Sequence, residues 1–357
     1  MLLFLGAGAS INFGIPDTKK FISVFENKVG SENIYIRLKE GITEDLFDTE
    51  VLMTLLFDLS KPKEELMNSI APHTFRFLIA QKDEIKYWLE DENMRMKCHD
   101  MLKTIRREIR VKCLIQAHDE HEKIMESYDK FFGCLSINKA ENAHDSSLMQ
   151  YPKLDIFTTN YDTCIEDYFS SRQVKYYRGI VDQFGEFVLD VTNPFSKDHQ
   201  INIAKLHGSI DLFINKGRVR IIPGTGMMDA PSPPFLSKYG TEFMIYPVES
   251  SSAIELLKSP IIEMIHTFRI SLINQRTWML IGSTFRDLTL ASIMNDVIAQ
   301  MPVDEYPRVI HINPEATGIN NILSTKGYHS LASVIKPMDA GFIDEQVISE
   351  LSKIHLS

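Results

Sequence analysis

Short apolar runs that end in polar or glycine-containing turns occur at the start of the chain and throughout its second half. The runs begin the segments 1–14, 154–162, 203–213, 277–287 and 308–316. Apolar strands that alternate with polar turns and helices are typical of a parallel sheet covered on both faces. In such sheets ligands bind at the carboxyl ends of the strands, where these turns would lie.

The stretch between the first and second apolar runs has a different period. Residues 49–59 and 73–135 place apolar side chains three and four positions apart, with few Gly or Pro, as amphipathic helices do. We therefore predict a Rossmann-like α/β domain with a parallel sheet, formed by residues 1–25 plus 151–357. A mostly helical insertion at residues 26–150 would interrupt it.

Composition narrows the class of protein. The 357 residues are 44% hydrophobic and 24% charged, with a net charge of −10, which excludes wholesale disorder. Because binding to nucleic acid needs clustered Lys and Arg, we do not expect direct nucleic acid binding. The basic residues Lys103, Arg106, Arg107 and Arg110 share a helical face, which we expect to be a solvated surface; contact with an acidic partner or nucleic acid is the alternative.

The four cysteines, at positions 98, 113, 134 and 164, form no CxxC pair. A structural zinc site needs a close pair of ligands, and a disulfide framework needs denser cysteines, so we expect neither. Scattered thiols suit a reducing cytoplasm. The sequence has no run of 18 apolar residues, so we expect no membrane span.

The first apolar run leads into a glycine turn, GAGAS at residues 6–10. Backbone N–H groups in such a turn can hold a phosphate, but a plain tight turn with Ser10 as a helix N-cap also explains it. Ile11 stands where the GxGxxG dinucleotide motif needs glycine, which disfavours a dehydrogenase. Pro16 and Asp17 follow and suit the first turn of a helix.

Two later turns contain candidate catalytic side chains. In TTNYD, residues 158–162, Asn160 and Asp162 can hydrogen-bond ribose hydroxyls or a carboxamide. The alternative is a structural turn, with Thr163 and Glu166 as a capping box for the next helix. In KLHGS, residues 205–209, His207 suits acid–base chemistry near neutral pH, although a lone histidine is often structural.

Taken together, GAGAS, GIPD, TTNYD, KLHGS, the Gly-Ser-Thr turn with Asp287, and IHIN resemble the sirtuin-like NAD-binding family in order and spacing. The pattern is most similar to the bacterial sirtuin-like NADases of antiphage defence, whose strand turn typically reads TTNYD. Sirtuin deacylases have Gln at the position of Thr159, Phe-Arg at that of Thr18 and Lys19, and a zinc module of paired cysteines. These departures disfavour deacylation and leave NAD binding intact.

The resemblance implies a role for each matching residue. Asn160 would hold the ribose hydroxyls or the attacking water, and His207 would be the acid–base residue. Asp17 would lie near the nicotinamide, and Asp162 would contact its carboxamide. The rest of the implied cofactor-binding set comprises the pyrophosphate cradle Gly6, Ala7, Gly8, Ala9 and Ser10, the adenosine contacts Thr284 and Asn313, and Gly282, Ser283 and Asp287.

The implied activity is hydrolysis of NAD⁺ at the nicotinamide–ribose bond, as an effector that depletes NAD in antiphage defence. Such an enzyme needs control, and the family often uses homo-oligomers or a partner such as a ring-forming translocase ATPase. The chain has no P-loop motif, so an ATPase would be a separate protein. The helical insertion is the candidate for assembly contacts. A non-catalytic NAD or ADP-ribose sensor, a protein deacylase and an ADP-ribosyltransferase are the alternative functions.

Overall fold

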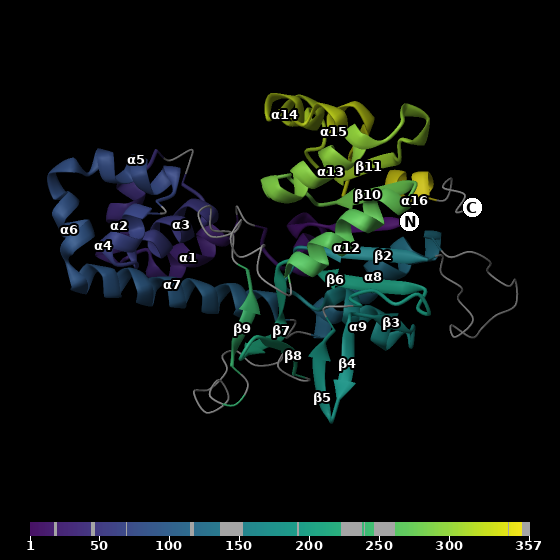
Figure 1. Cartoon of the computed structure of the whole chain (residues 1–357), viewed down its shortest axis with the longest axis horizontal. Coiled ribbons are helices and arrows are strands. Elements are labelled where there is room, and N and C mark those ends of the chain that lie inside the picture. The colour runs from purple at the N-terminus through teal and green to yellow at the C-terminus, as the bar shows by residue number, and fades with distance from the viewer. Residues whose placement is uncertain are drawn as a thin grey trace, which may run out of the picture.

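The computed structural model describes residues 1–17, 20–43, 47–68, 70–114, 118–135, 153–190, 193–222, 238, 240–245, 261–341 and 343–351. Thr18 and Lys19, which differ from the sirtuin deacylases, lie outside these residues. The described chain forms a parallel sheet core, a smaller antiparallel sheet and a helical lobe to one side (Figure 1).

A parallel sheet of seven strands, in the order β12-β11-β10-β1-β2-β6-β3, forms the core. Its strands are β1 (Leu2–Leu5), β2 (Leu154–Thr158), β3 (Tyr176–Tyr177), β6 (Ile201–Lys205), β10 (Thr277–Ile281), β11 (Arg308–Asn313) and β12 (Ile335–Asp339). The first strand lies between β10 and β2, in the middle of the sheet. The N-terminal segment and the second half of the chain therefore share one sheet, as the pattern predicted.

Helices cover both faces of this sheet because its strands are apolar on both sides. In β1, Leu3 and Leu5 join one apolar cluster, while Leu2 and Phe4 join the other. The first face packs against η1 (Ala7–Phe13), α8 (His118–Leu135), α9 (Cys164–Ser171) and α16 (Glu345–Leu351). The second face packs against α12 (Ile261–Asn274), α13 (Leu288–Gln300), α14 (Ile319–Thr325) and α15 (His329–Val334), and the short η6 (Val303–Glu305) follows α13. The predicted Rossmann-like α/β fold is confirmed.

The antiparallel sheet was not predicted from the sequence. It has five strands in the order β4-β5-β8-β7-β9. They are β4 (Ile180–Gln183), β5 (Glu186–Leu189), β7 (Gly208–Asn215), β8 (Arg218–Ile221) and β9 (Thr241–Met244). Because β7 begins one residue after His207, this sheet fixes the direction in which the chain leaves that residue.

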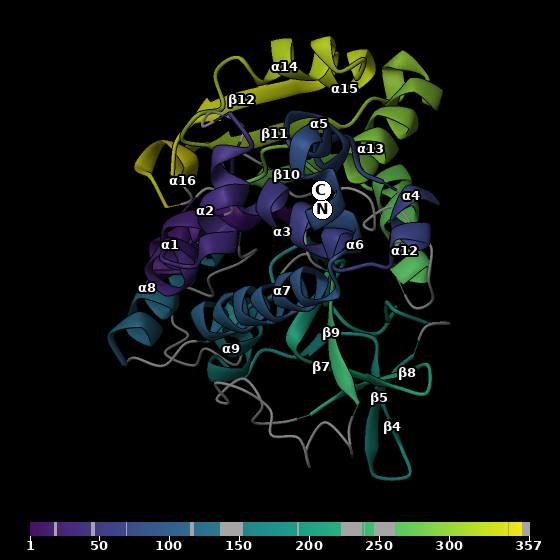
Figure 2. The same ribbon diagram turned by 90° about the vertical axis from the view of Figure 1, so that its left-hand side faces the viewer.

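The helical lobe is the region of residues 21–113, and most of its helices stand beside the sheets (Figures 1 and 2). It contains α1 (Phe21–Val29), α2 (Asn33–Glu40), α3 (Thr49–Leu59), α4 (Lys63–Asn68), α5 (Pro72–Ala80), η3 (Lys82–Glu84), α6 (Ile85–Glu90) and α7 (Glu92–Cys113). The predicted helical character is confirmed here. By its contacts with η1, α9 and α16, α8 lies against the sheet core, so the domain boundaries at 25 and 150 stay a prediction.

One end of the basic stripe on α7 differs from the expectation of a solvated face. Arg110 is only 1% exposed. Its Nη1 donates to the carbonyl of Ile210 at 2.7 Å and lies 2.9 Å from Oε1 of Glu242. The last turn of α7 reaches β7 and β9, so this guanidinium is a buried link between the lobe and the antiparallel sheet.

None of the helices in the described part of the chain combines the length and the apolar character that a membrane crossing requires.

Candidate functional site

The polar turns singled out in the sequence meet at the carboxyl edge of the parallel sheet. They follow β1, β2, β6, β10 and β11, which all point the same way. Ligands of open α/β sheets bind at this edge, so the fold brings the candidate residues to the expected place.

The glycine turn after β1 packs directly on the turn after β10. A Cβ at Gly6 would lie 2.6 Å from the carbonyl oxygen of Gly282, and one at Gly8 would lie 2.7 Å from its Cα. Gly282 has a φ of +64°. The Gly6 N–H donates to Ile281 O at 2.8 Å, and the Gly8 N–H to Gly282 O at 3.0 Å. These glycines are needed for the close approach of two backbones.

This packing limits how residues 6–10 can bind an anion. The Gly6 and Gly8 N–H groups are engaged, and the Ala9 N–H donates to Gly6 O at 2.9 Å. Ala7 opens η1, so its N–H has no acceptor inside that helix. The predicted pyrophosphate cradle stays a prediction, and of these N–H groups only that of Ala7 would be available to it. The alternative of Ser10 as an N-cap is wrong, because Gly6 holds the N-cap position.

Asn160 is fixed at the end of β2 by hydrogen bonds to the glycine turn. Its Nδ2 donates to Gly6 O and to Ser10 Oγ, both at 3.0 Å. The Ser10 hydroxyl in turn donates to Asp162 Oδ2 at 2.9 Å. Ser10 and Asp162 are 2% and 4% exposed. Asn160 is therefore held by buried groups from two segments about 150 residues apart.

The helix after this turn is capped differently from the prediction. Oδ1 of Asp162 accepts the Cys164 N–H at 3.1 Å, at the start of α9. The Thr163 hydroxyl donates to Asp167 instead, and the Glu166 carboxylate points to buried cations. The predicted capping box of Thr163 and Glu166 is therefore wrong, because both side chains have partners elsewhere.

His207 is paired with Asp287. Its Nε2 lies 2.9 Å from Asp287 Oδ2, and the imidazole is 16% exposed. The other carboxylate oxygen, Oδ1, accepts the N–H groups of Thr289 and Leu290 at 3.0 and 3.1 Å and so caps α13. Burial opposes ionisation of Asp287, but the hydrogen bond and charge of His207, with these N–H groups, hold the pKa of Asp287 below its usual value. The sequence analysis placed Asp287 in the cofactor-binding set and missed this pairing.

The turn at His207 is also held by the antiparallel sheet. Gly208 has a φ of +78°, and a Cβ there would lie 2.0 Å from Phe243 O. The His207 carbonyl accepts the N–H of Ile245 at 2.8 Å. Glycine is therefore required at position 208, and the chain after β9 fixes the histidine backbone.

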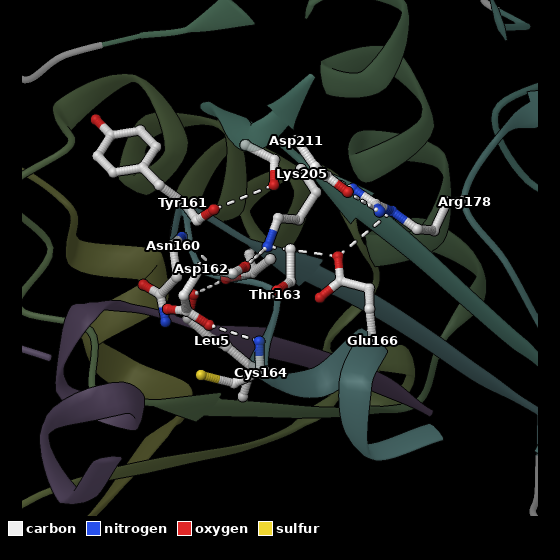
Figure 3. A network of polar contacts seen from close by, with 12 residues as sticks. Leu5, Asn160, Tyr161, Asp162, Thr163, Cys164, Glu166, Arg178, Lys205 and Asp211 are labelled. Atoms are coloured by element: carbon white, nitrogen blue, oxygen red, sulfur yellow. Dashed lines mark hydrogen bonds and ion pairs between the residues drawn. The ribbon is translucent and has the colours of Figure 1, made fainter. Parts of the chain in front are cut away.

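A buried ionic network lies next to the turn that contains Asn160 and Asp162 (Figure 3). Oε1 of Glu166 is 3.4 Å from both Arg178 Nε and Lys205 Nζ, and Arg178 Nη1 is 2.7 Å from Asp211 Oδ2. Lys205 also donates to the carbonyl of Asp162. Burial opposes ionisation of Asp211, but the charge and hydrogen bonds of Arg178 outweigh it and lower the pKa of Asp211 to about 2. The network ties the turn after β2 to the end of β6.

Of the other predicted cofactor-binding residues, some lie together at the edge of the sheet and Asp17 makes only a local contact. Ser283 and Asn313 are brought together, because Asn313 Nδ2 lies 3.3 Å from the Ser283 carbonyl, which also accepts from His311 Nε2 at 2.7 Å. Thr284 is exposed beside them. Asp17 makes a local contact, accepting the Lys20 N–H at 2.8 Å.

The first helix of the lobe begins later than predicted. The helix α1 starts at Phe21, so Pro16 and Asp17 do not occupy its first turn. Asp17 instead closes a short turn ahead of the helix. Its predicted place near a nicotinamide stays a prediction.

Within the described residues, no group of three or more His, Cys, Asp or Glu side chains is arranged to hold a metal ion. The expectation of a zinc-free protein stays a prediction.

The fold places a row of polar turns at the carboxyl edge of a Rossmann-like parallel sheet. Residues 155–327 match the family model of the SIR2-like domain, which supports a sirtuin-like family and NAD-related activity in general. The match begins within β2 and ends after α14, so β1, the glycine turn and the lobe lie outside it. No curated protein matches the chain.

Proposed function

We propose that the chain hydrolyses NAD⁺ at the nicotinamide–ribose bond, with Asn160 and His207 as its catalytic residues. The observation that supports this most is the held imidazole at the carboxyl edge of the sheet. His207 pairs with Asp287 at 2.9 Å, and Asn160 is fixed at the end of the neighbouring strand β2. A pure nucleotide sensor would need no acid–base group in that position.

Cleavage of this bond does not require the protein to activate the leaving group. Nicotinamide leaves as a neutral molecule from a positively charged nitrogen, so its protonation is unnecessary. The transition state develops positive charge on the ribose, as in other glycosidic cleavages. Asn160 would hold the ribose hydroxyls or the attacking water, and His207 would accept a proton from the water or a hydroxyl. A positioned general base contributes about 10²–10⁴-fold, or roughly 3–5 kcal/mol of barrier.

The direct test is nicotinamide release from NAD⁺ by the purified full chain. We expect His207→Ala to lower release by about 10²–10⁴-fold, and Asn160→Ala to abolish most of it, with both variants folded. His266→Ala is the matched control, because His266 is exposed on α12, and it should keep the wild-type rate. Unchanged release in His207→Ala would contradict the proposal. Calorimetric binding of NAD⁺ without release under any condition would favour the sensor.

We also propose that NAD depletion is the biological output, as an antiphage effector, and that assembly controls it. Exposed apolar side chains on the lobe support assembly: Phe75 and Ile79, one turn apart on α5, are 52% and 57% exposed. Sedimentation velocity on the samples used for the release assay, with and without a candidate partner ATPase, tests this. Full release by a species that is monomeric in every condition would contradict control by assembly.

A further inference from the structure

The pairing of His207 with Asp287 determines which nitrogen of the imidazole is free to react. Asp287 contacts Nε2. No hydrogen bond to Nδ1 of His207 is found among the described residues. The two ring nitrogens therefore have different environments, one against a carboxylate and one left for water or substrate.

The carboxylate fixes the tautomer. An ionised carboxylate only accepts hydrogen bonds, so Nε2 must bear the proton when it lies 2.9 Å from Asp287 Oδ2. In the neutral imidazole, Nδ1 then has the free lone pair. A general base needs that lone pair to face its proton donor.

The position of Asp287 does not depend on His207 alone. Its Oδ1 accepts two N–H groups at the first turn of α13, so its second oxygen is held toward the histidine by the helix itself. His207 reaches this oxygen from a turn 80 residues earlier. Because α13 holds Asp287 and its second oxygen contacts the imidazole, this residue is suited to orienting His207.

We propose that Asp287 is a positioning residue that holds His207 with its proton on Nε2 and so makes Nδ1 the proton-accepting atom of NAD⁺ cleavage. The role in catalysis rests on the proposed function, whereas the tautomer of His207 can be measured without any activity. In this proposal Asp287 orients His207 and does not contact the cofactor directly.

Two substitutions separate orientation from helix capping. Asn and Ser both cap helices well, so Asp287→Asn and Asp287→Ser should keep α13. The Asn amide can donate to Nε2 and would hold the proton on Nδ1, the wrong nitrogen. The shorter Ser cannot reach the ring and would leave the tautomer free. We therefore expect release to fall by about 10²–10⁴-fold in Asp287→Asn, as in His207→Ala, and by less in Asp287→Ser.

The tautomer is read by nitrogen NMR of the full chain labelled with ¹⁵N-histidine, with the signals of residue 207 identified by their loss in His207→Ala. We expect a proton on Nε2 in the wild type and on Nδ1 in Asp287→Asn. Asp91→Asn is the matched control: Asp91 caps α7 by accepting the N–H groups of Asn93 and Met94, away from the site. It should change neither the tautomer nor release.

The outcomes separate the two proposals. A wild-type proton on Nδ1, or one that stays on Nε2 in Asp287→Asn, overturns the positioning role. Wild-type release in Asp287→Asn with the tautomer reversed also overturns it. A wild type with the proton on Nε2, reversed in Asp287→Asn, but with no nicotinamide release in any condition supports the positioning and contradicts only the proposed NAD⁺ cleavage.

Discussion

The carboxyl edge of the sheet and the helical lobe are stabilised by different kinds of contact. At the edge, buried polar groups join segments far apart in sequence, such as Ser10 with Asp162 and His207 with Asp287. In the lobe, the interior is mainly apolar, with Leu52, Leu55 and Leu56 fully buried. The lobe also contains a buried carboxylate, Asp58, but the groups that donate to its Oδ2, the Ala71 N–H and the Thr74 hydroxyl, lie only 13 and 16 residues away in sequence.

The two kinds of contact tolerate substitutions to different degrees. Apolar packing accepts many side chains of similar volume, whereas a hydrogen-bonded network fails when one member is removed. We therefore expect the edge to require particular residues and the lobe to require only a pattern. Within the described residues, Arg286 at the edge pairs with Asp48 of the lobe, while Arg110 of the lobe pairs with Glu242 of the antiparallel sheet.

The largest expected effect is from removing the cation at the centre of the buried network. Arg178→Met would leave the Asp211 carboxylate buried without its partner and weaken the surroundings of Glu166. Breaking a buried ion pair by removing one partner costs about 3–5 kcal/mol. We expect the free energy of unfolding, measured with urea, to fall by that amount. Arg178→Lys keeps the charge and should lose less.

The matched substitution in the lobe is Leu55→Ala, at a side chain that is 0% exposed in α3. It should destabilise by a similar amount, about 2–5 kcal/mol, through the cavity it creates. At a temperature where both variants are folded, however, only Arg178→Met should lower nicotinamide release, because its network holds the turns of Asn160 and His207. Equal loss of release in both variants would contradict this difference between the edge and the lobe.

The second prediction concerns the loss of stability at acidic pH. The pKa of Asp211 is lowered from 3.8 to about 2, so its ionised form is favoured in the folded state. Its stabilisation is present above pH 3.8 and is lost as the pH falls toward 2; one pKa unit corresponds to about 1.4 kcal/mol, which gives about 2 kcal/mol in all. Urea unfolding at pH 5, 4 and 3 should show about half of this loss in the wild type, because pH 3 is still above the folded-state pKa of Asp211, and a smaller loss in Asp211→Asn.

Asp167 provides a control, because its contribution to stability changes with pH in the opposite direction. Burial raises the pKa of its carboxyl to about 6, so its contribution is fully present below pH 3.8 and is lost as the pH rises through about 6. Asp167→Asn should therefore gain stability relative to the wild type as the pH rises from 4 to 7. A pH dependence of Asp211→Asn equal to that of the wild type between pH 5 and 3 would contradict the assignment to Asp211.

The sequence was sufficient for the elements whose patterns are local. The strands β1, β2, β6, β10 and β11 were predicted because each is a short apolar run that ends in a polar turn. By contrast, β3 has only two residues, and β12 contains Pro337 and mostly exposed side chains, so neither showed that pattern. The antiparallel sheet was missed because most of its strands are short and partly exposed.

The candidate site was predictable as a set of residues and not as a set of contacts. Local capping rules assigned Thr163 and Glu166 to the start of α9, but Glu166 pairs with Arg178 and Lys205, which lie on other elements. The pairing of His207 with Asp287 spans 80 residues and follows only from the order of strands in the sheet. Periodicity contains no information on such partners.

The smallest expected effect is at the contact between the two regions. Arg286, next to Asp287, places Nη1 2.7 Å from Oδ2 of Asp48, whose Oδ1 caps α3. Both side chains are partly exposed, and such ion pairs contribute less than about 1 kcal/mol. Asp48→Asn keeps the cap and removes only the charge, so a double-mutant cycle with Arg286→Gln isolates the pair.

We expect a coupling energy below about 1 kcal/mol in urea unfolding and nicotinamide release within about twofold of the wild type in each variant of this cycle. The reason is that Asp287 is held by its own bonds to α13 and His207, so loss of the neighbouring ion pair should not move it. Asp48→Ala, which also removes the cap, should cost about 1 kcal/mol more. A coupling above 2 kcal/mol, or a tenfold change in release, would mean that the lobe acts directly on the carboxyl edge of the sheet, and the two regions would then have to be treated as one functional unit.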